Sequence, residues 1–86
     1  MVNETLKVLL ETMAKNSPYT LGTDYAVSIL HDDEKSFRIN IFPGGKYPWF
    51  FNGDCVALML AYANAFKLNC YVETNNNVPV VYLSHF

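Results

Sequence analysis

The sequence has few charged residues, and this scarcity is its most informative bulk property. Only 16% of the 86 residues are Asp, Glu, Lys or Arg, whereas 51% are hydrophobic. Charged residues usually make up about a quarter of a globular domain, and a chain this short has much surface to cover. We therefore expect some apolar surface to stay exposed or to be covered by another chain.

Other absences argue against several classes of protein. Six basic and eight acidic residues give a net charge of −2 without a basic patch, so direct binding to nucleic acid is not expected. No apolar run reaches the roughly 18 residues of a membrane span, and the first residues lack a signal-peptide pattern. Cys55 and Cys70 are too few for a disulfide framework and are interpreted as reduced, buried thiols. These features predict a cytoplasmic protein that does not bind membranes.

The first half of the chain is predicted to form a helix followed by a hairpin. Apolar residues recur at helical spacing after a start that Asn3 can cap: Val2, Leu6, Leu9, Leu10 and Met13. From Asp24 the apolar period changes to two, and it resumes at Phe37 after a short charged turn. Two alternating runs joined by such a turn predict an antiparallel hairpin with one apolar face.

The second half is predicted to begin with an unusually apolar helix, over residues 52 to about 68. Asn64 is the only strongly polar residue between Cys55 and Phe66. A helix that is apolar nearly all round is buried on more than one side. We therefore expect it to lie between the sheet and the first helix, or against a second copy of the chain.

A second hairpin is expected over residues 70–74 and 78–84. The three asparagines between these runs suit a turn, because Asn tolerates the left-handed region. Pro79 cannot donate to a ladder, so the last strand should lie at an edge or have Pro79 at its start. The predicted fold is a single α+β domain over residues 1–86, in the order α-β-β-α-β-β. Its four-stranded antiparallel sheet should carry two helices packed on one face.

The aromatic residues Tyr47, Trp49 and Phe50 are the first candidates for partner binding. Aromatic side chains offer large, rigid contact area at low entropic cost, and consecutive bulky residues are hard to bury together. The commoner role of such a cluster is internal, with Phe51 stapling the second helix and Trp49 closing one end of the core.

The acidic turn Asp32, Asp33 and Glu34 is predicted to form the charged rim of the same interface. Such a rim supplies specificity and a faster association rate. His31 adjoins the turn, but consecutive acids lack the alternating oxygen ligands of a calcium loop. A solvated hairpin turn is the commoner role of such a run.

No residue pattern indicates catalysis. Cys55 lies near the expected start of the second helix, where the helix dipole lowers a thiol pKa, but the neighbouring Asp54 opposes thiolate formation. Neither His31 nor His85 stands at a spacing typical of cysteine enzymes. The Pro-Gly-Gly-Lys segment at residues 43–46 lacks the following helix of a phosphate loop and is interpreted as a plain loop. We expect no enzyme activity, no cofactor and no metal.

An outward-facing aromatic set is expected on the sheet: Phe42, Tyr71 and Tyr82, with Arg38. Proteins that bind single-stranded RNA present aromatic side chains in this way. The set lacks surrounding Lys and Arg to neutralise a phosphate backbone, so RNA binding is the weaker interpretation.

The leading hypothesis is a non-enzymatic protein-binding module that docks sterically on a larger protein and forms a homodimer. In size, architecture and lack of catalytic groups the chain is similar to small accessory proteins of phages and mobile elements, a group that includes anti-CRISPR inhibitors. The resemblance implies a larger host protein or protein–nucleic-acid complex as the target. The alternative is a small-ligand binder or minimal enzyme whose pocket lies at a homodimer interface. Its candidate groups are His31, Asp54, Cys55, Tyr71 and Glu73.

Overall fold

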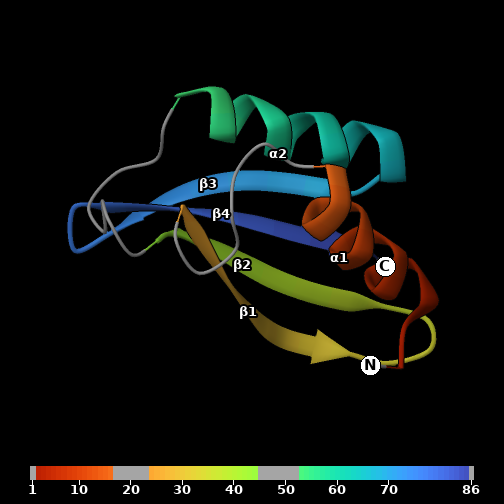
Figure 1. Ribbon diagram of the computed structural model, residues 1–86. Coiled ribbons are helices and arrows are strands. Elements are labelled where there is room, and N and C mark those ends of the chain that lie inside the picture. Colours follow the sequence, from red (N-terminus) through yellow and green to blue (C-terminus); the bar gives the residue numbers. More distant parts are fainter. Residues whose placement is uncertain (1, 17–23, 45–52, 86) are drawn as a thin grey trace.

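The computed structural model describes residues 2–16, 24–44 and 53–85, with side chains for all of these except residues 16 and 53–55. Its elements follow the predicted order: α1 (Glu4–Asn16), β1 (Tyr25–Asp32), β2 (Phe37–Pro43), α2 (Gly53–Phe66), β3 (Asn69–Asn75) and β4 (Val78–His85). The strands form a four-stranded antiparallel sheet, and both helices lie on the same side of it (Figure 1). The predicted α+β fold is therefore confirmed.

The strand order is β1-β2-β4-β3, so the two hairpins meet through their second strands. In this central pairing Ile39 lies opposite Leu83, and Ile41 lies opposite Val81. The inner strands β2 and β4 therefore supply the middle of the sheet. The strands β1 and β3 form its two free edges.

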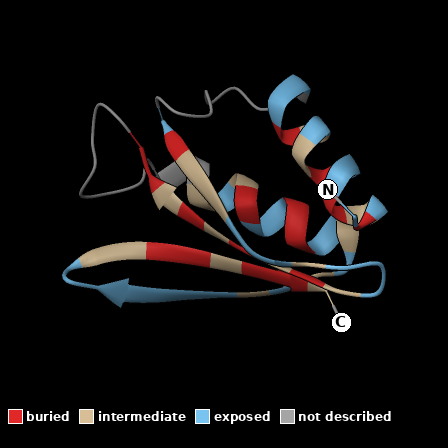
Figure 2. Cartoon of the chain, turned by 90° about the horizontal axis from the view of Figure 1, so that it is seen from below, coloured by how far each residue is buried: buried red, intermediate tan, exposed pale blue. Residues whose placement is uncertain are grey.

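The hydrophobic core fills the space between the sheet and the two helices. Buried residues follow the inner strands and one side of each helix, as Figure 2 shows in red. The cluster draws on both helices and on three of the strands: Leu6, Leu9, Met13, Tyr25, Phe37, Ile39, Ile41, Met59, Tyr62, Ala63, Val81 and Leu83. Tyr25 from β1 belongs to the same cluster, whereas β3 contributes only the partly buried Cys70.

The predicted cap of α1 is confirmed. The Asn3 side-chain oxygen Oδ1 accepts a hydrogen bond from the backbone N–H of Leu6 at 3.1 Å, which satisfies a donor of the first helical turn. Val2 was expected on the buried stripe, and that prediction is wrong. It precedes the helix, so it does not follow helical spacing, and its side chain is exposed.

The helix α2 packs on the sheet with one face only. Met59, Tyr62 and Ala63 are buried, whereas Leu60 and Ala61 are exposed. The helix is therefore not enclosed between the sheet and α1, and the first of the two arrangements expected for it is wrong. No helix in the described ranges is long and apolar enough to cross a membrane.

A β-bulge changes the alternation of β1 near its end. Ile29 pairs with Ile39 but His31 pairs with Arg38, so Leu30 is the extra residue. A bulge of this kind puts two residues opposite one and reverses the faces that follow. As a result Asp32 lies on the helix side of the sheet, opposite Phe37.

The second hairpin closes through a two-residue turn. Asn76 and Asn77 have φ values of 53° and 66°, which is the left-handed geometry that Asn tolerates and that a type I′ turn requires. The strand β4 lies inside the sheet, so an edge position for Pro79 is wrong. Its other predicted position, at the start of the strand, holds, because pairing with β2 begins only at Val81.

Candidate docking surfaces

The acidic turn between β1 and β2 is organised by Asp33. Its Oδ1 accepts backbone hydrogen bonds from Ser36 at 2.8 Å and Lys35 at 2.9 Å. Its Oδ2 lies 2.9 Å from Nε2 of His31. These backbone hydrogen bonds, that of Ser36 first, hold the pKa of Asp33 below its ordinary value. Part of the acidic charge therefore serves the turn itself.

Asp32 joins this turn to the start of α1. Its Oδ1 accepts a hydrogen bond from the backbone N–H of Asn3 at 2.7 Å, and its Oδ2 accepts one from Val2 at 3.0 Å. The hydrogen bond from Asn3 is the main reason why the pKa of Asp32 is lowered. In return Nδ2 of Asn3 donates to the backbone oxygen of Asp33 at 2.9 Å.

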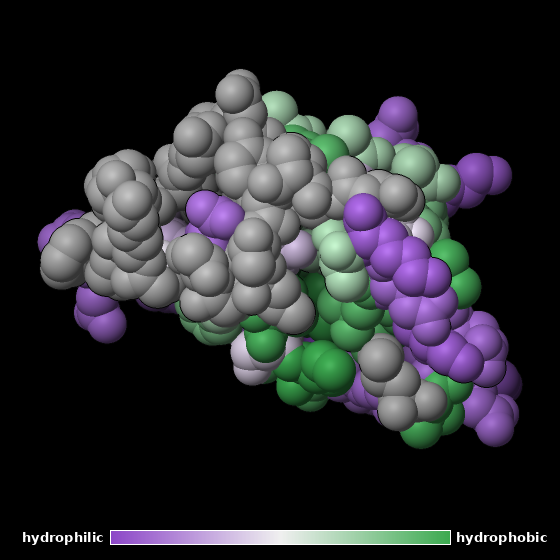
Figure 3. Space-filling view, viewed as in Figure 1, coloured by the Kyte–Doolittle hydropathy of each residue, from purple (hydrophilic) through white to green (hydrophobic). Residues whose placement is uncertain are grey.

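Three half-exposed apolar residues lie near the acidic turn, at the end of β1 and the start of the chain before α1, and we call them the β1-edge patch. They are Val2, Ile29 and Leu30, which are 54%, 46% and 51% exposed. The hydrogen bond that the backbone N–H of Val2 donates to Asp32 holds Val2 at the same end of β1 that carries the other two. Figure 3 shows hydrophobic residues over this end of β1, beside the hydrophilic ridge that α1 forms. Ile29 faces the helix side, opposite Ile39, and Leu30 follows it at the bulge, so the patch wraps around the edge of the sheet beside the acidic turn.

An open depression adjoins the same turn. The described residues that line it are the consecutive Asp33, Glu34, Lys35 and Ser36. Glu34 is exposed, and no hydrogen bond or ion pair joins it to another residue in the described ranges. Its carboxylate is therefore available to a partner, in contrast to that of Asp32.

The face of the sheet away from the helices carries an ordered aromatic cluster. The rings of Tyr71 and Tyr82 stack at 4.8 Å with an angle of 6° between their planes. The Arg38 guanidinium lies 5.9 Å from the centre of the Tyr82 ring and donates a hydrogen bond to the Tyr71 hydroxyl. The structure thus brings together three of the four residues expected on the outward face. Arg38 is the only Lys or Arg in the four strands, which supplies little charge for a phosphate backbone.

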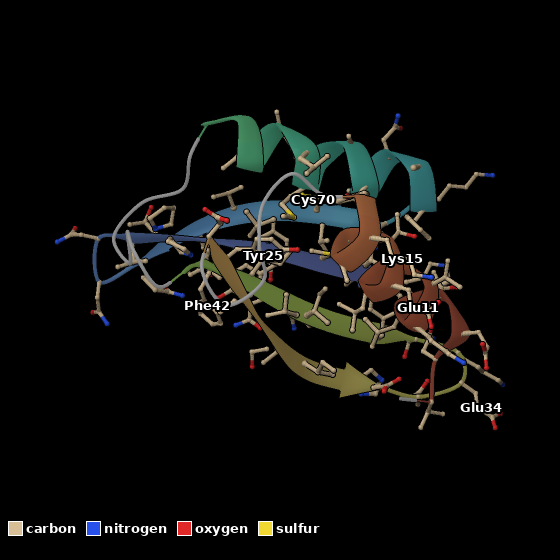
Figure 4. All side chains as sticks on the ribbon, viewed as in Figure 1. Glu11, Lys15, Tyr25, Glu34, Phe42 and Cys70 are labelled. Carbon is tan, nitrogen blue, oxygen red and sulfur yellow. The ribbon has the colours of Figure 1, made fainter. Side chains whose placement is uncertain are left out.

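The free edge at β3 is the most solvent-exposed part of the sheet. Every residue of β3 except Cys70 is exposed, and Val72 on the helix side is 50% exposed. Figure 4 labels Cys70, which lies between β3 and α2. Its thiol is free, and burial raises its pKa, so it is a poor nucleophile at neutral pH. The predicted buried thiol at this position is only partly buried.

Several candidate residues lie outside the described ranges. These are Tyr47, Trp49 and Phe50, together with the side chains of Asp54 and Cys55. The remaining groups of the small-ligand hypothesis are separated, because His31 lies on one edge strand and Tyr71 and Glu73 lie on the other. Within the described ranges no three His, Cys, Asp or Glu side chains lie close enough together to hold a metal ion.

The segment after β2 begins with a glycine that the fold requires. A Cβ added to Gly44 would lie 2.6 Å from the backbone nitrogen of Tyr25. The backbone N–H of Gly44 also donates to the backbone oxygen of Asp24 at 3.0 Å. This close approach explains the first glycine of the predicted loop without a ligand.

Comparison with family models, with curated proteins and with solved structures returned no match to this chain.

Proposed function

We propose that this protein is a non-enzymatic binding module that docks sterically on a larger protein through the β1-edge patch. The observation that carries the proposal is the apolar group Val2, Ile29 and Leu30, half exposed beside Asp33 and Glu34. Covering exposed apolar surface is favourable by about 25 cal/mol for each Å² removed from water. Burial of the patch against a partner would therefore contribute favourably to the free energy of binding.

The partner surface should have an apolar centre and Lys or Arg at its margin. Because Asp32 is held by the start of α1, and Asp33 by its own turn and His31, the carboxylate most available to a partner is that of Glu34. Exposed charges of this kind act mainly on the association rate and lose their effect as salt increases. We expect salt to slow association more than it speeds dissociation.

A second contact is proposed on sequence grounds at Tyr47, Trp49 and Phe50. If Trp49 faces the partner, Trp49→Ala should leave folding intact and weaken binding by about 2 kcal/mol or more. If Trp49 belongs to the core, the same change should cost about 3–5 kcal/mol of stability and unfold the domain. Circular dichroism and a binding titration on the same sample separate the two outcomes.

The biological role that we propose is that of an inhibitor or accessory protein. A small module without catalytic groups acts on a larger protein by occupying its surface. This is the role implied by the general similarity to accessory proteins of phages and mobile elements. The proposed target is a larger cytoplasmic protein, alone or in complex with nucleic acid.

The experiment begins with capture of partners from a host lysate and identification by mass spectrometry. Affinity for the purified partner is then measured with the wild type, with Leu30→Ser and with Glu34→Lys. We expect Leu30→Ser to weaken binding at least tenfold and Glu34→Lys to slow association. The matched control is Val8→Ser, which changes an exposed apolar residue on α1 outside the patch. Equal affinities for Leu30→Ser and the wild type would refute the proposed surface.

A further inference from the structure

We propose that β3 pairs with β3 of a second copy of this chain, antiparallel about a twofold axis at Val72. The pairing joins the two four-stranded sheets into one continuous sheet. It uses the edge opposite to the β1-edge patch, so it does not rest on the function proposed above. The occupant is a second copy because the strand is complementary to itself in one register.

The edge at β3 is open for pairing, whereas the edge at β1 is interrupted. The seven residues of β3 pair with β4 without a register shift. The β1 strand carries the bulge at Leu30, and bulges are one of the devices that protect edges from pairing with other chains. The sequence of β3 contains neither Lys nor Pro, which are other such devices. Of the two edges, only β3 pairs with its neighbour without a bulge.

The turn geometry fixes which backbone groups of β3 face outward. Asn75 lies opposite Val78 across the two-residue turn, and such turns are closed by a hydrogen-bonded pair. Hydrogen-bonded and non-hydrogen-bonded pairs alternate along an antiparallel ladder. The N–H and C=O groups of Cys70, Val72 and Thr74 therefore point away from β4, toward a new strand.

A twofold axis at Val72 is the register that uses all three residues. It places Val72 opposite Val72 of the second copy, and it places Cys70 opposite Thr74. The half-exposed Val72 side chains then cover each other on the helix side of the sheet. An axis at Glu73 would set two carboxylates directly opposite each other, which is destabilising.

Charge complementarity supports the same register on the outward face. Glu73 is exposed, and within the described ranges no hydrogen bond or ion pair joins its side-chain carboxylate to another residue. The axis at Val72 places Glu73 of one copy opposite Tyr71 of the other, and directly opposed residues have Cβ atoms about 5 Å apart. The Arg38 guanidinium donates to the Tyr71 hydroxyl, so this register brings each Glu73 toward the aromatic cluster that carries the cation. The single chain leaves this carboxylate without one.

The mass in solution tests the pairing. Sedimentation equilibrium should give a dimer with twice the 9.8 kDa of one chain. Val72→Pro removes only an outward N–H and adds bulk at the axis, so it should yield a folded monomer, with folding checked by circular dichroism. The control Val72→Thr keeps the N–H and should stay dimeric. These measurements should span protein concentrations from about 1 µM to about 100 µM, which lie above the dissociation constants of most specific complexes. A wild type that stays monomeric over this whole range would overturn the proposal.

A charge exchange gives a second, independent test. Glu73→Lys should weaken dimerisation at least tenfold, and adding Arg38→Glu in the same chain should restore it. A dimer that neither Val72→Pro nor Glu73→Lys weakens would show that another surface associates, which also contradicts the proposal. Because both changes lie far from the β1-edge patch, Val72→Pro should still bind the larger partner. Loss of dimerisation and loss of docking are therefore distinguishable.

Discussion

The carboxylate of Asp32 accepts a hydrogen bond from the backbone N–H of Asn3 at 2.7 Å, across 29 residues of sequence. The β-bulge at Leu30 makes this contact possible, because it turns Asp32 to the helix side of the sheet. The acidic turn that was predicted as an interface rim therefore has two roles. Asp32 fastens the start of α1, and Asp33 and Glu34 remain beside the β1-edge patch.

This contact makes the free energy of unfolding depend on pH in the acid range. The folded-state pKa values of Asp32 and Asp33 are lowered, so the stability that these groups contribute is present above the ordinary Asp pKa of about 3.9. It is lost as the pH falls through the lowered folded values. Urea unfolding between pH 7 and pH 2.5 should show Asp32→Asn less stable than the wild type at pH 7, with a shallower decline below pH 4. Glu34→Gln is the matched control and should keep the wild-type decline.

Gly44→Ala should destabilise the domain. The added Cβ would lie 2.6 Å from the nitrogen and 2.8 Å from the Cα of Tyr25, and the backbone of β1 cannot move aside without disturbing a buried residue. We expect a loss of about 1–3 kcal/mol, the usual cost of overpacking. Chemical denaturation measures it, with the exposed Ala61→Ser as a control that should change stability by less than about 0.5 kcal/mol. A neutral Gly44→Ala would contradict the close approach.

Lys67→Gly should stabilise the domain. Lys67 has a φ of 56° and ends α2 in a Schellman-type cap, in which the N–H of Leu68 donates to the oxygen of Ala63 at 2.7 Å. Glycine adopts this left-handed conformation without the steric cost that a side chain pays. We expect a gain of about 0.5–1 kcal/mol in denaturant unfolding. Ala65→Gly, two residues earlier in the helix, should instead lose about 1 kcal/mol.

Two adjacent residues of α2 test which face of that helix packs on the sheet. Met59 is fully buried and Leu60 is 49% exposed. Met59→Ala should cost about 2–5 kcal/mol because it leaves a cavity, whereas Leu60→Ala should change stability by less than about 0.5 kcal/mol. Similar losses for both variants would mean that a second copy or another partner covers Leu60.

Local patterns in the sequence determined the elements of this protein. Helical spacing with the Asn3 cap predicts α1, period-two alternation predicts the strands, and the tolerance of Asn for positive φ predicts the turn at Asn76. Each of these depends on interactions within a few residues, so the sequence contains them directly. The scarcity of charge likewise predicts exposed apolar surface, but it does not say where that surface lies.

Only the tertiary structure decided how distant segments meet. Residues far apart in the chain meet where β2 pairs with β4 and where Arg38 donates to Tyr71. The bulge at Leu30 likewise depends on how β1 pairs with β2. The sequence itself shows that Val2 and Val72 are apolar, but strand order decides which apolar residues the helices cover. Strand order depends on which edges pack most favourably, a global balance that no short stretch of sequence records. For that reason the strand order, and not any short segment of sequence, determines where the candidate docking surfaces lie.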